Sequence, residues 1–340
     1  RRVRWEFSRT APGQVLVGPS VNELEPVSSE PALMHDVLLE GLEPDSHYIY
    51  RVTGEDEQGR TLESETFTFR TAPDDRRPIR FAIVGDTQSN PNINGQIGER
   101  IWSDRPDFFM IVGDLVGTGA NKTHWVEEFF RSMRPLLSRI PLLPVLGNHE
   151  GDARLYYDYM SLPEPEYYYK FKYGPADFFV IDSQRNVGAE SEQYQWLEEQ
   201  LAASDAPWKF VAHHYPPFSS DEDDHGNLWE GQSTWGIVRM RELTELYERY
   251  DVDIVWNGHI HSYERTFPLS QMQYEEDGVI YVICGGGGGG LETPGPTRPW
   301  FSNYVRYGHH YVLVSLTENK LEYRAYDVEG RLFDTLVLEK

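Results

Sequence analysis

The chain has 340 residues, enough to bury one large core or two ordinary ones. It carries 31 Lys and Arg against 55 Asp and Glu, a formal net charge of −24, and this acidity without a basic cluster argues against a nucleic-acid partner. A single cysteine, Cys284, excludes an intrachain disulfide, and its apolar neighbours predict a buried side chain.

The first 73 residues contain short segments in which apolar and polar side chains alternate, separated by Gly, Pro, Asp and Asn. This pattern is typical of the strands of a small β-sandwich. Residues 74–78 are polar and bounded by prolines, so we predict a linker there. The expected strands are Val3–Phe7, Gln14–Val17, Met34–Leu39, His47–Thr53 and Glu65–Arg70.

From residue 79 onward, apolar strand-like segments alternate with segments in which apolar residues recur every three or four positions. This rhythm predicts an α/β layered core. After about residue 278 the pattern returns to strands, which we expect to complete a second sheet packed on the first. Helices are expected over 125–137, 191–203 and 234–250, and late strands over 279–284, 311–316, 321–326 and 332–338.

Five apolar segments of this second region end in Asp, Asn or His, the side chains that commonly hold metal ions. In an α/β sheet the loops at the carboxyl ends of the strands gather at one edge, so these side chains can converge. Three carboxylate or amide oxygens and three imidazoles suffice for two ions about 3.5 to 4 Å apart, the spacing of two-metal hydrolases. The segments are 79–86, 107–114, 142–149, 208–214 and 252–261.

The order of these motifs is Gly-Asp, Gly-Asp, Gly-Asn-His-Glu, Val-x-x-His and Gly-His-x-His, beginning at Gly85, Gly113, Gly147, Val211 and Gly258. It resembles the calcineurin-like metallophosphoesterase superfamily. The run from 259 to 265 and the preceding β region are most similar to purple acid phosphatases. The resemblance implies a four-layer α/β/β/α metallophosphoesterase sandwich over residues 79–340. It also implies a fibronectin type III-like sandwich over residues 1–73 that lacks its first strand.

The resemblance also implies a ligand set for two metal ions. The Val-x-x-His spacing selects His214 over His213 as the ligand of that segment. The implied ligands are Asp86 and His261 for the first ion, Asp114 as the bridge, and Asn148, His214 and His259 for the second ion.

Two positions depart from the pattern of the purple enzymes and their relatives. Where the purple family places a tyrosine, three residues after the bridging aspartate, this chain has Gly117, so neither the purple colour nor Fe(III) is expected. Gln88 replaces the histidine of other superfamily members, and it either gives an amide oxygen to the first metal or hydrogen-bonds a ligand. With fewer anionic ligands, we expect two divalent ions of Fe, Mn or Zn.

The resemblance implies a phosphatase that hydrolyses phosphate monoesters by in-line attack of metal-activated hydroxide. His149, paired with Glu150, would protonate the leaving alkoxide or hold phosphate; the alternative is that His149 only packs the loop. His225 either faces the substrate, as in similar enzymes, or is a solvated surface histidine. The alternative functions are a phosphodiesterase or nucleotidase at the same centre, and a binding protein with a degenerate metal site.

The expected partners are a phosphorylated small molecule as substrate and inorganic phosphate as product. One alternative for the assembly is an oligomer that forms through the β-sandwich. No apolar run approaches the roughly 20 residues that span a bilayer, and no leader with a charged start and an apolar middle is present. We expect a secreted or periplasmic protein whose leader has been removed.

Overall fold

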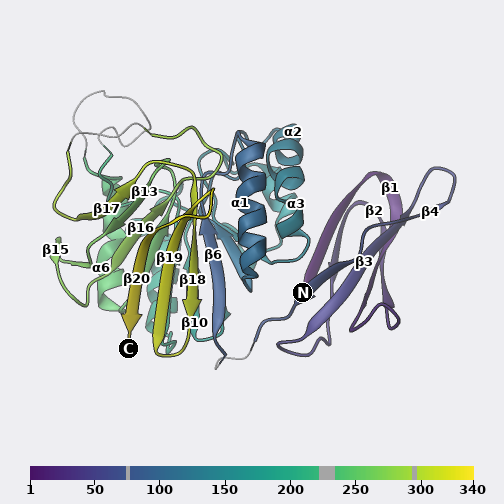
Figure 1. Cartoon of the computed structure of the whole chain (residues 1–340), viewed down its shortest axis with the longest axis horizontal. Helices are drawn as coiled ribbons and strands as arrows, with labels where there is room; N and C mark the ends of the chain where they lie inside the picture. Colours follow the sequence, from purple (N-terminus) through teal and green to yellow (C-terminus); the bar gives the residue numbers. More distant parts are fainter. Residues whose placement is uncertain (74–76, 222–233, 293–296) are drawn as a thin grey trace.

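The computed structural model describes residues 1–73, 77–221, 234–292 and 297–340 (Figure 1). An antiparallel sheet comes first in the chain, and a larger body of two sheets and several helices follows it. None of the helices in these ranges combines the length and the apolar character that a membrane-spanning helix needs.

The N-terminal region forms one five-stranded antiparallel sheet in the order β2-β1-β3, with β4 and β5 both paired to the other edge of β3. The expected strands Val3–Phe7 and Gln14–Val17 are parts of one long strand, because pairing with β2 continues through register shifts between Glu6 and Gly13. The second sheet of a sandwich is not seen among the described residues, and the fibronectin-like fold stays a prediction. The strands are β1 (Arg2–Gly18), β2 (Glu25–Leu38), β3 (His47–Glu55), β4 (Thr61–Glu63) and β5 (Phe67–Arg70).

Two mixed sheets form the rest of the molecule. One has the strand order β20-β19-β18-β6-β7-β8, with β6 (Ile79–Val84), β7 (Phe108–Ile111), β8 (Leu142–Pro144), β18 (His310–Leu316), β19 (Lys320–Asp327) and β20 (Leu332–Glu339). The other has the order β17-β13-β16-β12-β11-β10-β9, with β9 (Tyr169–Tyr173), β10 (Ala176–Val180), β11 (Trp208–Ala212), β12 (Ile254–Asn257), β13 (Tyr263–Thr266), β16 (Ile280–Cys284) and β17 (Ser302–Arg306). A small hairpin joins β14 (Leu269–Ser270) to β15 (Gln273–Tyr274).

The expected grouping of the late strands is wrong in one respect. Strand β16 pairs in parallel with β12 in the seven-stranded sheet, whereas β18 pairs with β6 and leads β19 and β20 into the six-stranded sheet. Apolar alternation shows that a strand is buried, but hydrogen bonds to distant strands decide which sheet it joins. Cys284, at the end of β16, is buried as expected.

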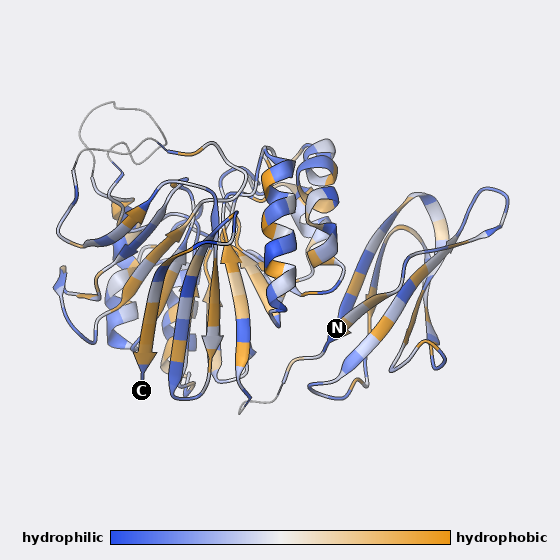
Figure 2. Cartoon of the chain, viewed as in Figure 1, coloured by the Kyte–Doolittle hydropathy of each residue, from blue (hydrophilic) through white to orange (hydrophobic). Residues whose placement is uncertain are grey.

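The two sheets pack face to face, and helices cover their outer faces. Phe81 and Phe108 of one sheet contact Phe178 of the other with ring centroids 5.2 and 5.3 Å apart. Figure 2 shows apolar residues concentrated on the central strands. The mixed α/β architecture is therefore confirmed. Helices α1 (Pro91–Asp104), η1 (Trp125–Phe130) and α3 (Arg131–Leu137) share a core with the six-stranded sheet, and α5 (Glu192–Ala202), η2 (Val238–Leu243) and α6 (Thr244–Arg249) share one with the seven-stranded sheet.

Two further helical segments are short: α2 (Lys122–His124) leads into η1, and α4 (Arg154–Tyr159) follows β8. The helix expected over 234–250 begins later, at Val238, as a 3₁₀ turn that continues into α6. Its start is delayed because Gly236 has a φ of +110°, outside the helical region.

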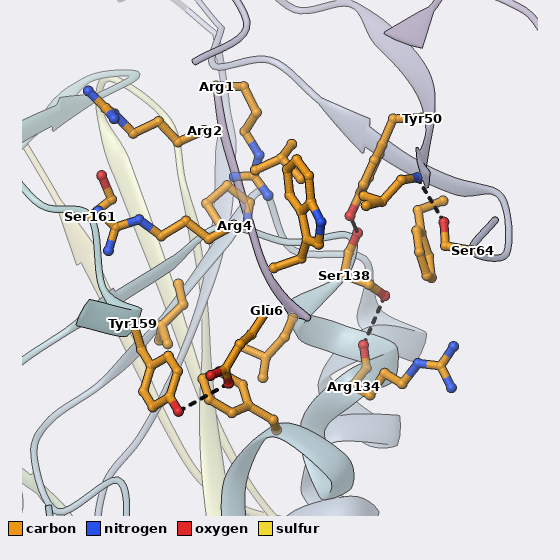
Figure 3. Close-up of a pocket in the computed structure, with 18 of the residues that line it drawn as sticks. Arg1, Arg2, Arg4, Glu6, Tyr50, Ser64, Arg134, Ser138, Tyr159 and Ser161 are labelled. Atoms are coloured by element: carbon orange, nitrogen blue, oxygen red, sulfur yellow. Dashed lines mark hydrogen bonds between the residues drawn. The ribbon is translucent and has the colours of Figure 1, made fainter. Parts of the chain in front are cut away.

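A hollow of about 940 Å³ separates the N-terminal sheet from η1 and α3 (Figure 3). Tyr50 donates its hydroxyl hydrogen to the carbonyl of Ser138 at 2.6 Å, and Arg134 pairs with Glu65 at 2.8 Å, so the two regions touch beside the hollow. None of the side chains expected to bind metal lines it. This hollow is therefore separate from the candidate site.

His310, at the start of β18, should make the protein less stable in mild acid. Its side chain is 1% exposed, and burial lowers its pKa to about 4 from the ordinary 6.5. As pH falls below 6.5 the unfolded chain binds this proton and the folded chain does not. Stability is therefore lost down to about pH 4, at about 1.4 kcal/mol per pH unit and about 3 kcal/mol in total.

Urea unfolding of wild type and His310→Gln at pH 7 and pH 4.5 measures this effect. We expect the variant to lose about 2 to 3 kcal/mol less than wild type between the two pH values, since glutamine does not titrate. Equal losses in the two proteins would rule out His310 as a source of the acid sensitivity.

Candidate metal centre

Asp86 and Asp114 follow the carboxyl ends of the parallel strands β6 and β7. Both have a positive φ, 59° and 53°, which aspartate tolerates better than most residues. A Cβ on Gly113 would lie 2.2 Å from Nδ1 of His214, so only glycine fits directly before Asp114. The Gly-Asp motif thus allows close approach of a backbone and an imidazole.

The other candidate ligands come from the ends of three further strands. Asn148 follows β8, His214 follows β11, and His259 and His261 follow β12. The structure brings all of them to one edge of the paired sheets. This is the convergence that the five motifs predicted, and it arises because parallel strands place their carboxyl ends together.

Ligand atoms of Asp114, His214 and His259 lie within 4.8 Å of one another. Nε2 of His214 is 3.1 Å from Oδ2 of Asp114 and 3.1 Å from Oδ1 of Asn148. These four side chains form one half of the candidate centre and are the donor types that divalent zinc, manganese and iron accept.

Asp86, Gln88 and His261 form the other half. Nε2 of His261 is 3.4 Å from Oδ1 of Asp86 and 3.2 Å from the Gln88 amide nitrogen. The backbone N–H of His259 donates to the Asp86 carboxylate at 3.0 Å, which ties the two halves together. Oε1 of Gln88 is buried without a hydrogen-bond partner, so an amide oxygen is available for a cation.

Backbone carbonyls orient two of the candidate imidazoles. Nδ1 of His214 contacts the Val112 carbonyl at 2.8 Å, and Nδ1 of His261 contacts the Gly290 carbonyl at 2.5 Å. Each contact leaves Nε2 facing the centre, as in metal-binding histidines. A Cβ on Gly289 would lie 2.7 Å from the His261 ring, so the glycine-rich run packs closely against this ligand.

His213 points away from the centre. Its Nδ1 contacts the Tyr215 carbonyl at 2.8 Å, and burial lowers its pKa to about 3, so the ring is neutral. His214 is placed where the Val-x-x-His spacing predicted a ligand.

The charges of the site suit a cation. Burial opposes a charged His214, but the charge and hydrogen bond of Asp114 outweigh it and raise the pKa of His214 to about 10. In the same way Asp86 raises the pKa of His261 to about 9 against the effect of burial. Buried carboxylates here are balanced by protons on imidazole. Divalent ions at the same place would balance them while the imidazoles act as neutral ligands.

His149 lies beside the centre and is accessible. Its Nε2 is 3.8 Å from Oδ2 of Asp114, its Nδ1 contacts the Gly117 carbonyl at 2.9 Å, and its side chain is 38% exposed. This position fits a group that contacts a substrate. His225 falls in 222–233, outside the described residues.

Glu150 lies in a different place from the one expected of a partner to His149. It is 1% exposed, and its carboxylate accepts hydrogen bonds from four backbone N–H groups. The donors are Asp114 at 3.0 Å, Leu115 at 2.8 Å, Val116 at 3.3 Å and Gly147 at 2.8 Å. Burial, followed by the charge of Asp114, raises its pKa. The side chain holds the loops of Asp114 and Asn148 together, and this geometry does not support a proton donor to substrate.

Sequence reasoning missed Glu128. Its Oε2 accepts the N–H of Gly117 at 2.7 Å and that of Ser89 at 3.1 Å, which links the loops after β6 and β7. A Cβ on Gly117 would lie 3.2 Å from His124 and 3.3 Å from Glu128. These two side chains occupy the space beside Gly117. Glu128 lies within a helical segment, and no local motif marks it.

Replacing Glu150 should lower the metal affinity of the candidate centre without removing a proton donor. Glu150→Ala leaves several buried N–H groups unpaired, at about 1 to 3 kcal/mol each, and we expect metal affinity to fall about 10- to 100-fold. Titration of metal into the metal-free variant measures the loss. At saturating metal the alkaline limb of the pH–rate profile should match that of wild type, because a proton donor loses activity as pH rises through its pKa. Disappearance of that limb in the variant would restore the role of proton donor.

The comparisons with known proteins agree with this geometry. The family model of calcineurin-like phosphoesterases matches residues 79–263, and the chain belongs to this family. Probable inactive purple acid phosphatase 27 of Arabidopsis thaliana is 27% identical, with coverage of 84% of this chain and 54% of the relative. Purple acid phosphatase 23 of the same plant is 28% identical, with coverage of 75% and 62%. The resemblance to purple acid phosphatases is therefore confirmed, and the chain spans less than two thirds of these relatives.

A solved structure has the same fold. The purple acid phosphatase PPD1 from yellow lupin (Lupinus luteus) seeds matches with a TM-score of 0.86 at 20% sequence identity. The match covers 99% of this chain and 72% of the lupin chain. At this identity it establishes the fold alone.

Proposed function

We propose that this phosphoesterase-family chain hydrolyses phosphate monoesters at a dinuclear centre of divalent ions. The observation that carries the proposal is the convergence of Asp114, His214 and His259, next to the pair of Asp86 and His261. Oxygen and nitrogen donors of this kind suit Zn, Mn or Fe(II). Asn148 and the unpartnered oxygen of Gln88 extend the donor set.

The proposed roles of the side chains follow from their positions. Bound divalent ions polarise phosphoryl oxygens and lower the pKa of water. Asp114 would face both halves of the centre. His149 would hydrogen-bond a substrate oxygen, because the Gly117 carbonyl engages its Nδ1 and leaves Nε2 accessible. Glu150 and Glu128 would position the loops. His225 is kept as a candidate for substrate contact.

The domain division is part of the proposal. Residues 1–73 would be the fibronectin type III-like domain, 74–78 the linker and 79–340 the metallophosphoesterase domain. The separate five-stranded sheet supports the first, and the pairing of β18 with β6 supports a second domain that continues to the C-terminal strands. A secreted or periplasmic location and an oligomer through the N-terminal sheet also stay predictions.

Phosphate release measures the proposed function. The protein would be purified, stripped of metal, reloaded with Mn, Zn or Fe(II), and assayed on p-nitrophenyl phosphate and bis(p-nitrophenyl) phosphate. We expect turnover that depends on metal and a higher kcat/KM for the monoester. A preference for the diester would move the function to a phosphodiesterase or nucleotidase. The absence of turnover with any of the metals would favour the alternative of a binding protein that has no catalytic activity. The name of one relative, probable inactive purple acid phosphatase 27, also supports this alternative.

A further inference from the structure

A small polar hollow of about 260 Å³ lies beside Asn148, next to the half of the centre that contains His214. It is smaller than the roughly 300 to 1,000 Å³ of sites that hold a whole ligand, so it fits part of a substrate. The side chains of its wall, apart from one leucine, are polar: Asn148, Asp152, Asp182, Gln184 and Arg185.

Ion pairs hold this wall in place. Nε of Arg185 is 3.0 Å from Asp182, and its Nη2 is 2.9 Å from Asp152. The guanidinium also lies 4.0 Å from the ring centroid of Tyr167. Asp182 is 2% exposed and accepts the backbone N–H of Gln184 at 2.8 Å. The hydrogen-bonding groups of the hollow are thus preorganised.

Tyr215 connects the hollow to the candidate metal centre. Its side chain hydrogen-bonds Gln184, and its ring centroid lies 4.4 Å from that of His259. Arg239 lies 5.2 Å from the Tyr215 ring centroid and donates to the Arg185 carbonyl at 3.2 Å. Asn148 is therefore both a candidate metal ligand and part of the wall of the hollow, and Tyr215 links the wall to His259.

The chemistry of the wall selects a type of occupant. Asp152 and Asp182 balance Arg185 and Arg239, so the wall has no excess positive charge for a second phosphate. An apolar ring would remove the polar groups of the wall from water without giving them a new hydrogen bond, which is costly. A hydroxyl group both donates and accepts a hydrogen bond, and it matches carboxylate, amide and guanidinium alike.

We propose that this hollow is a leaving-group subsite for a hydroxyl-rich group, such as the sugar or polyol of a phosphate monoester. The inference rests on the proposed phosphatase function and names its substrate class. Gln184 and Asp152 contact the leaving group and determine specificity.

The ratio of kcat/KM for glucose 6-phosphate to kcat/KM for phenyl phosphate tests the subsite. Wild type should prefer the sugar phosphate, and the ratio should fall about tenfold in Gln184→Ala and in Asp152→Asn. Asparagine keeps the positive φ of residue 152, which is 55°. Gln96→Ala, an exposed glutamine on α1, is the matched control and should keep the wild-type ratio.

A binding measurement accompanies the kinetics. In saturation-transfer NMR, the sugar ring protons of glucose 6-phosphate should receive saturation from the wild-type protein. The same signal should be weaker with Gln184→Ala. If wild type cleaves phenyl phosphate but both variants keep its ratio, the subsite is overturned and the phosphatase function stands. If wild type cleaves neither ester with metal bound, the phosphatase function itself fails.

Discussion

Replacing Asp114 is expected to abolish most metal binding and to lower phosphate release by about 10³-fold. The carboxylate is buried at the end of β7, with His214 at 3.1 Å and His149 at 3.8 Å from Oδ2. Loss of a cation at this position removes several kcal/mol of transition-state stabilisation. The rate falls about tenfold for each 1.36 kcal/mol by which the activation free energy rises. No other described residue supplies a carboxylate to the cluster of His214 and His259.

Elemental analysis of Asp114→Ala and Asp114→Asn, alongside phosphate release from p-nitrophenyl phosphate, measures the result. Asparagine keeps the φ of 53° and an acceptor for the N–H of His149, so it separates loss of charge from loss of loop geometry. Asp277→Ala, on an exposed loop, is the control and should keep about two metals per chain. Unchanged turnover in both Asp114 variants would eliminate the dinuclear mechanism.

Breaking the buried pair of Arg265 and Asp334 is expected to cost about 3 to 5 kcal/mol of unfolding free energy. Arg265, on β13 of one sheet, donates to Asp334, on β20 of the other, at 2.7 and 2.9 Å. Tyr263 also donates its hydroxyl hydrogen to Asp334 at 2.5 Å. The pair joins the two sheets, and Arg265→Met would leave a carboxylate that is only 8% exposed without its cation.

Urea unfolding at pH 7 of Arg265→Met, Asp334→Leu and the double variant measures this cost. The double variant should recover most of the loss, because replacing a whole buried ion pair by apolar groups is often neutral. Arg324→Ala, which breaks a surface pair with Glu322, is the control and should cost less than about 1 kcal/mol. If Arg265→Met lowers the unfolding free energy by less than the surface control does, the pair does not stabilise the contact between the two sheets.

The fold was predictable to the level of its elements. Strands such as Leu321–Tyr326 lie where apolar alternation predicted them, since β19 spans Lys320–Asp327. The sheet that β16 joins was not predictable, because it depends on pairing with β12, whose residues are more than 20 positions earlier. The continuity of β1 was not predictable either, because pairing with β2 across the register shifts makes one strand of the expected strands Val3–Phe7 and Gln14–Val17.

The candidate site was predictable where a motif ends a strand and not where loops meet. Asp114 contacts His214, and Asp86 accepts the N–H of His259, each at the end of a strand. The place of Glu150 was not predictable, because its four partners are backbone N–H groups, which leave no mark in the side-chain pattern. The role of Glu128 was not predictable for the same reason, because its carboxylate accepts backbone N–H groups, those of Ser89 and Gly117.

The amino-acid sequence by itself determined the membership in the phosphoesterase family, and it gave the order along the chain of the candidate donor residues. It does so because parallel strands carry their terminal residues to a common edge, whatever the loops between them do. The tertiary structure alone decided that the Gln88 amide faces His261, that Glu150 is enclosed by backbone N–H groups, and that a polar hollow opens beside Asn148. These features depend on contacts between loops far apart in the chain, and such contacts form only when the sheets have packed.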